Sequence, residues 1–332
     1  MLEIKDLKVA IGPHTIVDIE RLSVPTSARL GIVGESGSGK TMTAMTVVGL
    51  QPNDAVVTGS ISFEGQELVG STDRQLADVR GRLIGVIFQD PAKALNPMMR
   101  IGRQVTEAIK LHLDLSRDQV RDRVIDLLTQ VHLPDAEGLL RRYPHQLSGG
   151  QQQRVLIAIA IACDPKLLIA DEPTTALDVT VQNGILSLLK ELSESRNMGL
   201  LFVSHDLGVI ETISETIGVI YGGHMVEFGR TNEVINNPRH RYTRALVSAN
   251  PGIAADEHLE DVLNQRLEVI RGSVPALGRF PSGCRFRGRC TAEIDACAQL
   301  PEVSVSADGH IFKCWNPVDQ DASNHGAVDV VH

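Results

Sequence analysis

The sequence predicts an α/β protein that binds a phosphate group at the carboxyl edge of a parallel sheet. Residues 34–41 fit the pattern G-x-x-x-x-G-K-[ST] and lie between an apolar strand, 30–33, and an apolar helical stretch, 42–50. Near-continuous apolar runs at 83–88, 167–170 and 200–203 each end in polar residues. Such runs are typical of parallel strands covered on both faces, which place their ligand at the carboxyl ends.

The composition excludes some classes of protein. The 332 residues carry a formal net charge of −9, which argues against nucleic acid as the main partner. No apolar run approaches the roughly 18 residues needed to span a bilayer, and the N-terminus lacks a signal-peptide core. We therefore expect a cytoplasmic chain whose five cysteines are reduced, so that any membrane role comes through partners.

The elements follow in order along the chain. Period-two apolar spacing predicts strands at 2–9 and 15–24, with a turn at Gly12-Pro13, and a further strand at 59–63. Helical spacing dominates from 91 to 144, where Ser116 and Gln119 form a capping-box pattern, and it returns at 181–192. The pattern loosens after about residue 250, which predicts a domain boundary there.

The glycine loop carries the first piece of chemistry. Its glycines allow successive backbone N–H groups to turn inward, and the following helix adds its partial positive charge. Lys40 is placed to reach the β- and γ-phosphates of a nucleotide, and the Thr41 hydroxyl to bind Mg²⁺.

A second helix N-terminus in the chain has the same anion-binding character. Ser148, Gly149, Gly150 and Gln151 open the apolar helix expected at 155–162. One nucleotide cannot easily use both sites within one subunit. The economical solution is a dimer in which this helix caps the phosphates held by the other subunit. The stretch resembles the signature sequence of ABC (ATP-binding cassette) ATPases.

The resemblance implies a fold, a domain plan and an activity. The fold would be a P-loop NTPase core with a mixed sheet, an antiparallel β subdomain and an inserted helical subdomain, at about 91–145. This nucleotide-binding domain would occupy 1–250, followed at 251–332 by a small cysteine-rich extension of the oligopeptide-transporter type. The implied activity is ATP hydrolysis coupled to solute transport.

The resemblance also assigns catalytic and Mg²⁺ positions. Residues 166–172 (KLLIADE) resemble the Walker B strand, so Asp171 would hold Mg²⁺ and Glu172 would act as general base. Gln89 matches the Q-loop glutamine that contacts metal and water, and His205 matches the switch histidine at the γ-phosphate. With Lys40, these make up the expected catalytic set, and Thr41, Gln89 and Asp171 the expected Mg²⁺ ligands.

The expected nucleotide contacts form a larger set. Residues 176–178 (Ala-Leu-Asp) resemble the D-loop, whose aspartate would cross the dimer interface. The family's adenine-stacking aromatic is missing between Val9 and Asp18, and His14 is the nearest substitute. The full set is Gly34, Glu35, Ser36, Gly37, Ser38, Gly39, Lys40, Thr41, Thr43, Gln89, Asp171, Ser148, Gly149, Gly150, Gln151, Asp178 and His14.

Further stretches resemble one branch, the peptide/nickel permease ATPases. Typical of it are residues 89–97, 143–146 and 170–182, and a segment at 238–246 in which Arg241 replaces the usual proline. The implied function is peptide uptake together with a second ATPase subunit in a head-to-tail dimer. Two transmembrane permease subunits and an extracytoplasmic solute-binding protein would complete the system, with this chain peripheral at the cytoplasmic face of the membrane. A nickel or metal-chelate importer is the alternative, and a soluble ABC ATPase acting on nucleic acid is a third reading.

The tail carries separate chemistry. Cys284, Cys290, Cys297 and Cys314 follow the spacing C-x5-C-x6-C-x16-C, which predicts a metal site in a reduced compartment. Structural zinc usually shows closer cysteine pairs, whereas wide spacing suits an iron–sulfur cluster. Some members of the branch bind a [4Fe–4S] cluster in such a tail, so we expect that cluster, with zinc as the alternative. Cys163 is expected to be a buried residue on the helix that follows Ser148.

Overall fold

The computed structural model describes residues 1–175, 177–250, 270–307 and 309–318. Its contacts divide the chain into two compact units. Unit 1 comprises Met1–Leu7, Glu20–Leu30 and Thr41–Val203, and unit 2 comprises Lys8–Ile19, Gly31–Lys40 and the described part of Ser204–His332. No helix among the described residues is both long and apolar enough to cross a membrane.

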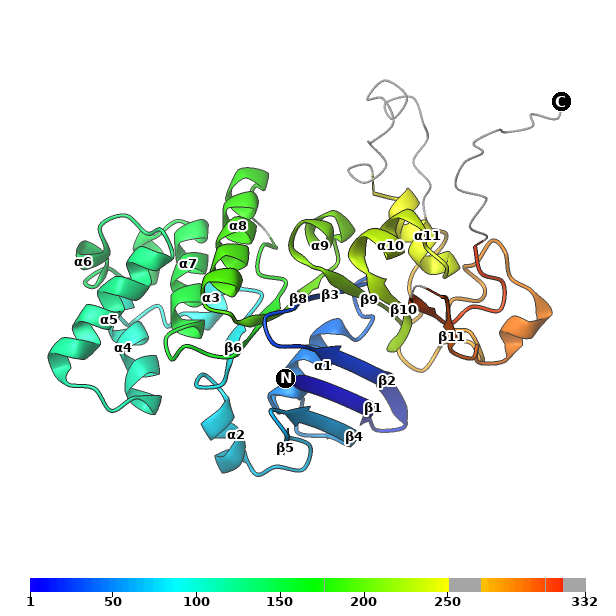
Figure 1. Ribbon diagram of the computed structural model, residues 1–332, viewed down its shortest axis with the longest axis horizontal. Coiled ribbons are helices and arrows are strands. Elements are labelled where there is room, and N and C mark those ends of the chain that lie inside the picture. Colours follow the sequence, from blue (N-terminus) through cyan, green and yellow to red (C-terminus); the bar gives the residue numbers. More distant parts are fainter. Residues whose placement is uncertain (176, 251–269, 308, 319–332) are drawn as a thin grey trace, which may run out of the picture. The chain divides into compact units, whose positions relative to one another are not determined.

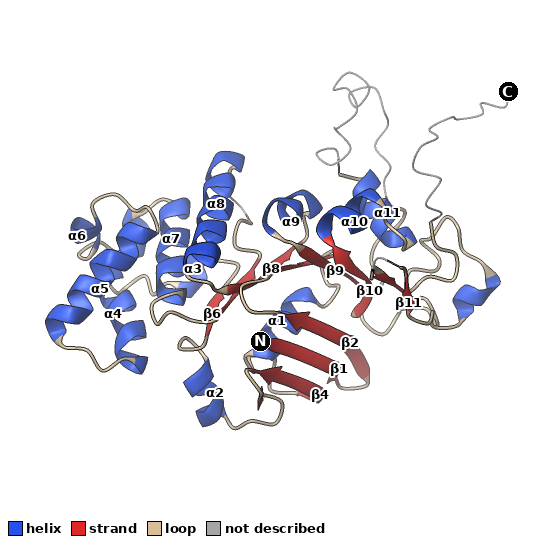
Figure 2. Ribbon diagram, in the orientation of Figure 1, coloured by secondary structure: helices blue, strands red, loops and turns tan. Residues whose placement is uncertain are grey.

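From β6 to β9 the strands of the structure alternate with helices, as in an α/β fold (Figure 2). Their bounds are β1 Leu2–Ile11, β2 His14–Val24, β3 Arg29–Val33, β4 Ala55–Phe63, β5 Gln66–Glu67, β6 Ile84–Ile87, β7 Leu167–Asp171, β8 Gly199–Ser204, β9 Thr216–Tyr221, β10 His224–Arg230, β11 Ser304–Val305 and β12 Ile311–Phe312. Within unit 1 the strand orders are β3-β8-β7-β6 and β5-β4-β1-β2, and within unit 2 the order is β2-β10-β9-β3, with β12 beside β10.

The parallel core expected from the apolar runs is confirmed in unit 1. Strand β6 pairs in parallel with β7, and β7 with β8. Every residue of β7 and β8 is buried. Unit 2 adds antiparallel pairing, because β9 runs antiparallel to β10 while β10 pairs in parallel with β2. The sheet is therefore mixed, as expected.

The helices of unit 1 begin with α1 Lys40–Val47 and α2 Asp73–Val79, and α8 Val179–Ser195 follows β7. A helical subdomain lies between β6 and β7 (Figure 1). Its helices are α3 Pro91–Ala94, α4 Ile101–His112, α5 Arg117–Gln130, α6 Ala136–Leu139 and α7 Gly149–Ala160. Helix α4 buries Ile101, Val105 and Ile109 at helical spacing and packs on α5 and α7. The capping box predicted at Ser116 and Gln119 is present.

Three details differ from the sequence expectations. Strand β4 begins at Ala55 rather than 59, since exposed positions at its start hide the alternation. Helix α5 ends at Gln130, before the left-handed His132, so the helical spacing predicted across 91–144 is interrupted there. Cys163 is buried as expected, but α7 ends at Ala160, so this cysteine follows the helix and its thiol points to the Ala108 carbonyl at 3.6 Å.

Unit 2 contains three α-helices among its described residues, α9 Leu207–Ile213, α10 Thr231–Asn236 and α11 Arg241–Ser248, and a short 3₁₀ helix at Asp295–Ala298. The cysteine-rich tail joins its sheet through β12, which pairs antiparallel with β10 at Glu227 and Phe312. The expected domain boundary near 250 adjoins residues 251–269, which lie outside the described residues, and it stays a prediction.

Candidate functional site

The phosphate loop in unit 2 runs so close to neighbouring backbone that two of its glycines cannot be replaced. A Cβ on Gly34 would lie 2.1 Å from the Ile220 carbonyl oxygen. Gly39 has φ +101°, and its Cβ would lie 3.0 Å from the Ile16 carbonyl oxygen. These positions need glycine because the backbone adopts a left-handed conformation or passes another chain segment in contact. The loop is therefore a packed cradle rather than an open turn.

Donor groups gather in this cradle. The Lys40 ammonium is buried and donates to the carbonyl oxygens of Gly34 at 2.8 Å and Glu35 at 3.0 Å. The Ser38 hydroxyl is buried with no hydrogen-bond partner among the described residues. Helix α1 begins at Lys40, so its first N–H groups face the same end. An ammonium, an unpartnered hydroxyl and a helix N-terminus fit the phosphates of a nucleotide.

Thr41 and Asp171 form the predicted Mg²⁺ pair in unit 1. The Thr41 hydroxyl donates to Asp171 Oδ1 at 2.9 Å. Asp171 ends β7 and is buried, while Thr41 lies in the first turn of α1. Hydroxyl and carboxylate oxygens are ligands that Mg²⁺ prefers, so the donor set fits this ion.

Glu172 lies beside Gln89 in a strained backbone position. It has φ +44°, and its N–H donates to the Val203 carbonyl at 2.9 Å. The carboxylate oxygen Oε2 accepts from Gln89 Nε2 at 2.9 Å and from the Thr175 hydroxyl at 3.1 Å. A left-handed non-glycine residue costs free energy, and such residues concentrate at functional sites. The structure thus brings the expected base together with the Q-loop amide, and adds Thr175.

His205 follows β8 and precedes Asp206, the N-cap of α9 in unit 2. The neighbouring Asp206 caps that helix by accepting from Gly208 N at 2.9 Å, and it also accepts from the Asn250 amide at 3.2 Å. The backbone beside His205 is therefore fixed by capping bonds. Its contact with a γ-phosphate stays a prediction.

The signature stretch has the geometry of an open helix N-terminus. Ser148 caps α7 by accepting from Gln151 N at 3.3 Å, and Gln151 Oε1 accepts from Ser148 N at 3.1 Å. A Cβ on Gly150 would lie 2.6 Å from Val181 Cγ1, whereas the nearest described atom to one on Gly149 would be Leu177 Cδ2 at 3.6 Å. Packing within the subunit explains the glycine at 150 but not the exposed glycine at 149.

Three other predicted nucleotide contacts, Asp178, Thr43 and His14, lie in surroundings unlike those of the phosphate loop. Asp178 caps α8, accepting from Val181 N at 2.9 Å, while Ala176 of the D-loop lies outside the described residues. Thr43 is fully buried within α1. His14 is exposed in β2, and its ring lies against Gly278 of the tail, where a Cβ would come within 2.5 Å of it.

The four cysteines of the tail lie near one another without being assembled around one ion. Cys297 is buried, and the other three thiols are half-buried. Burial, together with the neighbouring Cys297 and Cys314, raises the pKa of the Cys284 thiol to about 11. Burial and then Cys297 raise the pKa of Cys290. The described residues contain no group of three or more His, Cys, Asp or Glu side chains placed to hold a metal ion.

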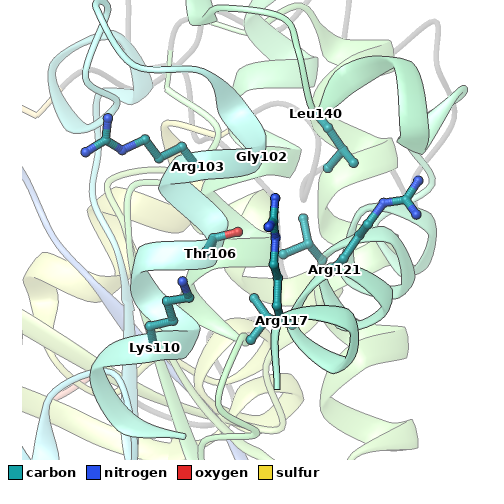
Figure 3. A pocket seen from close by; sticks show the side chains of 9 residues that line it. Gly102, Arg103, Thr106, Lys110, Arg117, Arg121 and Leu140 are labelled. Carbon is teal, nitrogen blue, oxygen red and sulfur yellow. The ribbon is translucent and has the colours of Figure 1, made fainter. Parts of the chain in front are cut away.

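Two cavities in unit 1 are distinct from these residues. One, of about 320 Å³, lies between α4 and α5 (Figure 3). Its Arg103 and Arg121 extend outward to pair with Glu107 and Glu137. The other, of about 520 Å³, is an apolar groove that includes Phe88 beside Gln89. Neither cavity is lined by a predicted nucleotide contact.

Sequence reasoning missed two residues that hold the phosphate loop. Tyr242 Oη accepts from Glu35 N at 2.8 Å, and Arg289 donates to the Glu35 carboxylate. A sequence signal existed for Arg289 alone, because an acidic side chain in a loop built for anions calls for a cation beside it.

Comparison with known proteins gives matches over nearly the whole chain. Residues 18–175 match the ABC transporter family, and residues 226–297 match the oligopeptide/dipeptide transporter C-terminal region. The oligopeptide transport ATP-binding protein OppD of Salmonella typhimurium is 38% identical, covering 96% of this chain and 95% of that protein. The dipeptide transport ATP-binding protein DppD of Escherichia coli is 42% identical, covering 96% and 97%.

Solved structures give the same result. A dimeric ATP-binding cassette in a post-hydrolysis state, bound to ADP and Pi, matches with a TM-score of 0.62 and 27% identity. The match covers 70% of this chain and 99% of that one. CbiO1 from Clostridium perfringens, part of an ABC transporter complex, has the same TM-score at 25% identity and covers 70% of this chain and 89% of its own.

Proposed function

Because this chain belongs to the ATP-binding subunits of ABC transporters, in the oligopeptide/dipeptide branch, we propose that it hydrolyses MgATP to drive uptake of peptides. The observation that carries the proposal is the hydrogen bond between Thr41, at the end of the phosphate loop, and Asp171, at the end of β7. Within unit 1, it brings together the two side chains that the proposal assigns to Mg²⁺.

Each residue then has a task in hydrolysis. The loop amides and Lys40 would hold the phosphates, and Thr41 and Asp171 would hold Mg²⁺. When bound, Mg²⁺ neutralises charge on the β- and γ-phosphates. Glu172 accepts a proton from the attacking water, and Gln89 orients its carboxylate through the 2.9 Å hydrogen bond. His205 is proposed to contact the γ-phosphate, and His14 to lie beside the adenine.

The site is proposed to be shared between two ATPase subunits. Among the described residues of its own subunit, nothing gives the exposed Gly149 at the N-terminus of α7 a steric reason to be glycine. A partner's phosphates approaching this helix end supply that reason, since backbone N–H groups can contact them closely only without a side chain. The dimeric cassette among the solved relatives supports the arrangement. Asp178 is proposed to reach across the same interface.

The apolar groove of unit 1 is proposed to receive a helix of a membrane subunit. Phe88, 42% exposed, and Leu111, 77% exposed, flank it, and Phe88 is next to Gln89 in the chain. Exposed large apolar side chains around a groove are typical of interaction sites. Movement in the site would then reach the membrane through Gln89. We propose that the subunit lies at the cytoplasmic face of the membrane, with a solute-binding protein on the other side.

We propose a [4Fe–4S] cluster for the four cysteines, with zinc as the alternative. The reasons are the four neighbouring thiols and their wide spacing in sequence. Bound there, the cluster would cross-link segments of the tail, whose described residues have little regular structure. Protein purified without oxygen should show broad visible absorption with stoichiometric iron and sulfide, and Cys290→Ser should lose both. Colourless protein with one zinc ion per chain would overturn the cluster.

Transport by the assembled system tests the main proposal. Vesicles containing this ATPase, its partner ATPase and permease subunits, and the binding protein should accumulate a labelled dipeptide only with ATP. Lys40→Ala should abolish accumulation, and the isolated chain should hydrolyse ATP poorly because its sites are incomplete. The relatives named for peptide transport favour peptides over nickel. Uptake of nickel and not of peptide would overturn the assignment.

A further inference from the structure

The phosphate loop and the cysteine-rich tail are joined by a buried ion pair in unit 2. Arg289 Nη1 donates to Glu35 Oε2 at 2.7 Å, and Nη2 donates to Glu35 Oε1 at 3.0 Å. The Arg289 side chain is 7% exposed and that of Glu35 is 27% exposed. Two parallel bonds between a guanidinium and a carboxylate fix orientation as well as distance. The second residue of the loop is thus held by the tail.

The guanidinium itself is fixed from several directions. Its Nε donates to the Arg271 carbonyl at 2.8 Å, and Nη2 donates to the Gly272 carbonyl at 3.3 Å. Nη1 also donates to the Tyr221 hydroxyl at 3.2 Å. The rings of Tyr221 and Phe286 lie within 5.7 Å and 5.9 Å of the guanidinium carbon. With so many partners, the Arg289 guanidinium is held in one orientation and can fix the position of the group that it binds.

The backbone of Glu35 is held by the same cluster. Glu35 N donates to the hydroxyl of Tyr242, which is fully buried in α11. The Tyr242 ring packs against Tyr221 at 4.6 Å and against Phe286 at 5.3 Å between ring centroids. Glu35 is therefore fixed at its amide and at its carboxylate by one connected group of side chains.

We propose that Arg289 is a positioning residue for the ATP site, acting through Glu35 on the phosphate loop. The Glu35 carbonyl accepts from Lys40 Nζ at 3.0 Å, so the residue that Arg289 holds also contacts the loop lysine. Arg289 N and Cys290 N both donate to the Phe286 carbonyl at 3.1 Å. One turn of the tail thus sets both the Arg289 side chain and a cysteine of the expected cluster. The inference rests on the proposed binding of ATP by this loop.

The test measures MgATP hydrolysis by the assembled transporter and binding of a fluorescent ATP analogue with Mg²⁺ to the full-length chain. Arg289→Ala and Glu35→Gln should each raise the KM for ATP about tenfold, with kcat changed less than about threefold, because binding by the loop is lost equally in the ground and transition states. The double variant should be no worse than either single variant. Arg289→Lys should fall between, since it keeps the charge but not the paired bonds.

Arg287 provides the matched control. It lies two residues away and pairs with Glu293 at 3.2 Å, within its own turn. Arg287→Gln should leave both constants unchanged. If Arg289→Ala fails to fold, Glu35→Gln decides, because it leaves the tail intact.

The outcomes distinguish a failure of the positioning role of Arg289 from a failure of ATP binding by the phosphate loop. A KM for Glu35→Gln within about twofold of that of Arg287→Gln would overturn the positioning role. A fall in kcat at unchanged KM would overturn it equally. Lys40→Ala is measured alongside, and binding of the analogue to Lys40→Ala at the affinity of the unaltered protein would refute the loop assignment itself.

Discussion

Gln89 Nε2 donates a 2.9 Å hydrogen bond to Glu172 Oε2, the oxygen that also accepts from the Thr175 hydroxyl. The side-chain amide of Gln89, which follows β6, thereby orients the carboxylate of Glu172, which follows β7. With Glu172 as the proposed general base, this contact would tie catalysis to the segment that leads into the helical subdomain, because a general base works only when its carboxylate points to the water.

Glu172→Gln should lower ATP hydrolysis about 10²- to 10⁴-fold, because the amide cannot accept the proton of the water. ATP binding should persist, so the assembled transporter should retain ATP while releasing little phosphate. Glu191→Gln, in an exposed pair with His132 on unit 1, is the control. Hydrolysis at the unaltered rate would remove Glu172 from this role.

Gln89→Ala should lower kcat about tenfold, since removal of one hydrogen bond leaves the base poorly oriented. Gln89→Glu should lower it further, because a second carboxylate would repel Glu172. Steady-state kinetics at several Mg²⁺ concentrations measures both effects. A raised Mg²⁺ requirement at unchanged kcat would show that Gln89 acts as a metal ligand and not on Glu172.

Substitution by alanine should affect stability at Gly150 and ATP hydrolysis at Gly149. Gly150→Ala should reduce the free energy of unfolding by about 1–3 kcal/mol, since its Cβ would lie 2.6 Å from Val181 Cγ1. Gly149→Ala should leave unfolding unchanged but reduce hydrolysis by the assembled dimer. Chemical denaturation and phosphate release measure the two effects. Full activity of Gly149→Ala would contradict a shared site.

Leu111→Asp should prevent the ATPase from co-purifying with its membrane subunits, because it places a charge at the rim of the apolar groove. Val56→Asp is the matched control, as Val56 is 62% exposed on β4 of the same unit and outside the groove. The measurement is recovery of the complex from membranes. Equal recovery of both variants would exclude the groove as the docking surface.

His240 should make stability depend on pH. Burial lowers its pKa from 6.5 to about 3, and its Nδ1 accepts from Tyr242 N at 3.1 Å. The folded-state pKa of His240 lies below its unfolded value. The contribution of the neutral imidazole to the free energy of unfolding is therefore complete above pH 6.5 and is lost as pH falls toward 3. Between pH 7.5 and 5 the loss is about 2 kcal/mol.

Asn caps helices well, so His240→Asn should keep the cap at α11 and lose that dependence. Denaturant unfolding of both proteins at the two pH values measures the difference. A variant with the same pH dependence as the unaltered chain would refute this role of His240.

Much of the site could be predicted from the sequence because its chemistry depends on consecutive residues. The loop at 34–41, the Asp171–Glu172 pair after an apolar strand and the capped helix at Ser148 are local patterns with a local physical cause. The apolar runs likewise predicted the buried parallel strands, since strands covered on both faces exclude polar side chains.

Only the tertiary structure decided which distant side chains meet. Arg289 and Glu35 are 254 positions apart, and no periodicity links an arginine beside a cysteine to the second residue of a phosphate loop. Likewise, Gly149 and Gly150 look alike in sequence, and only the packing of α7 on Val181 distinguishes the one that the fold requires. Burial and contact depend on how the chain returns to itself, which is a property of the folded chain and not of any short segment.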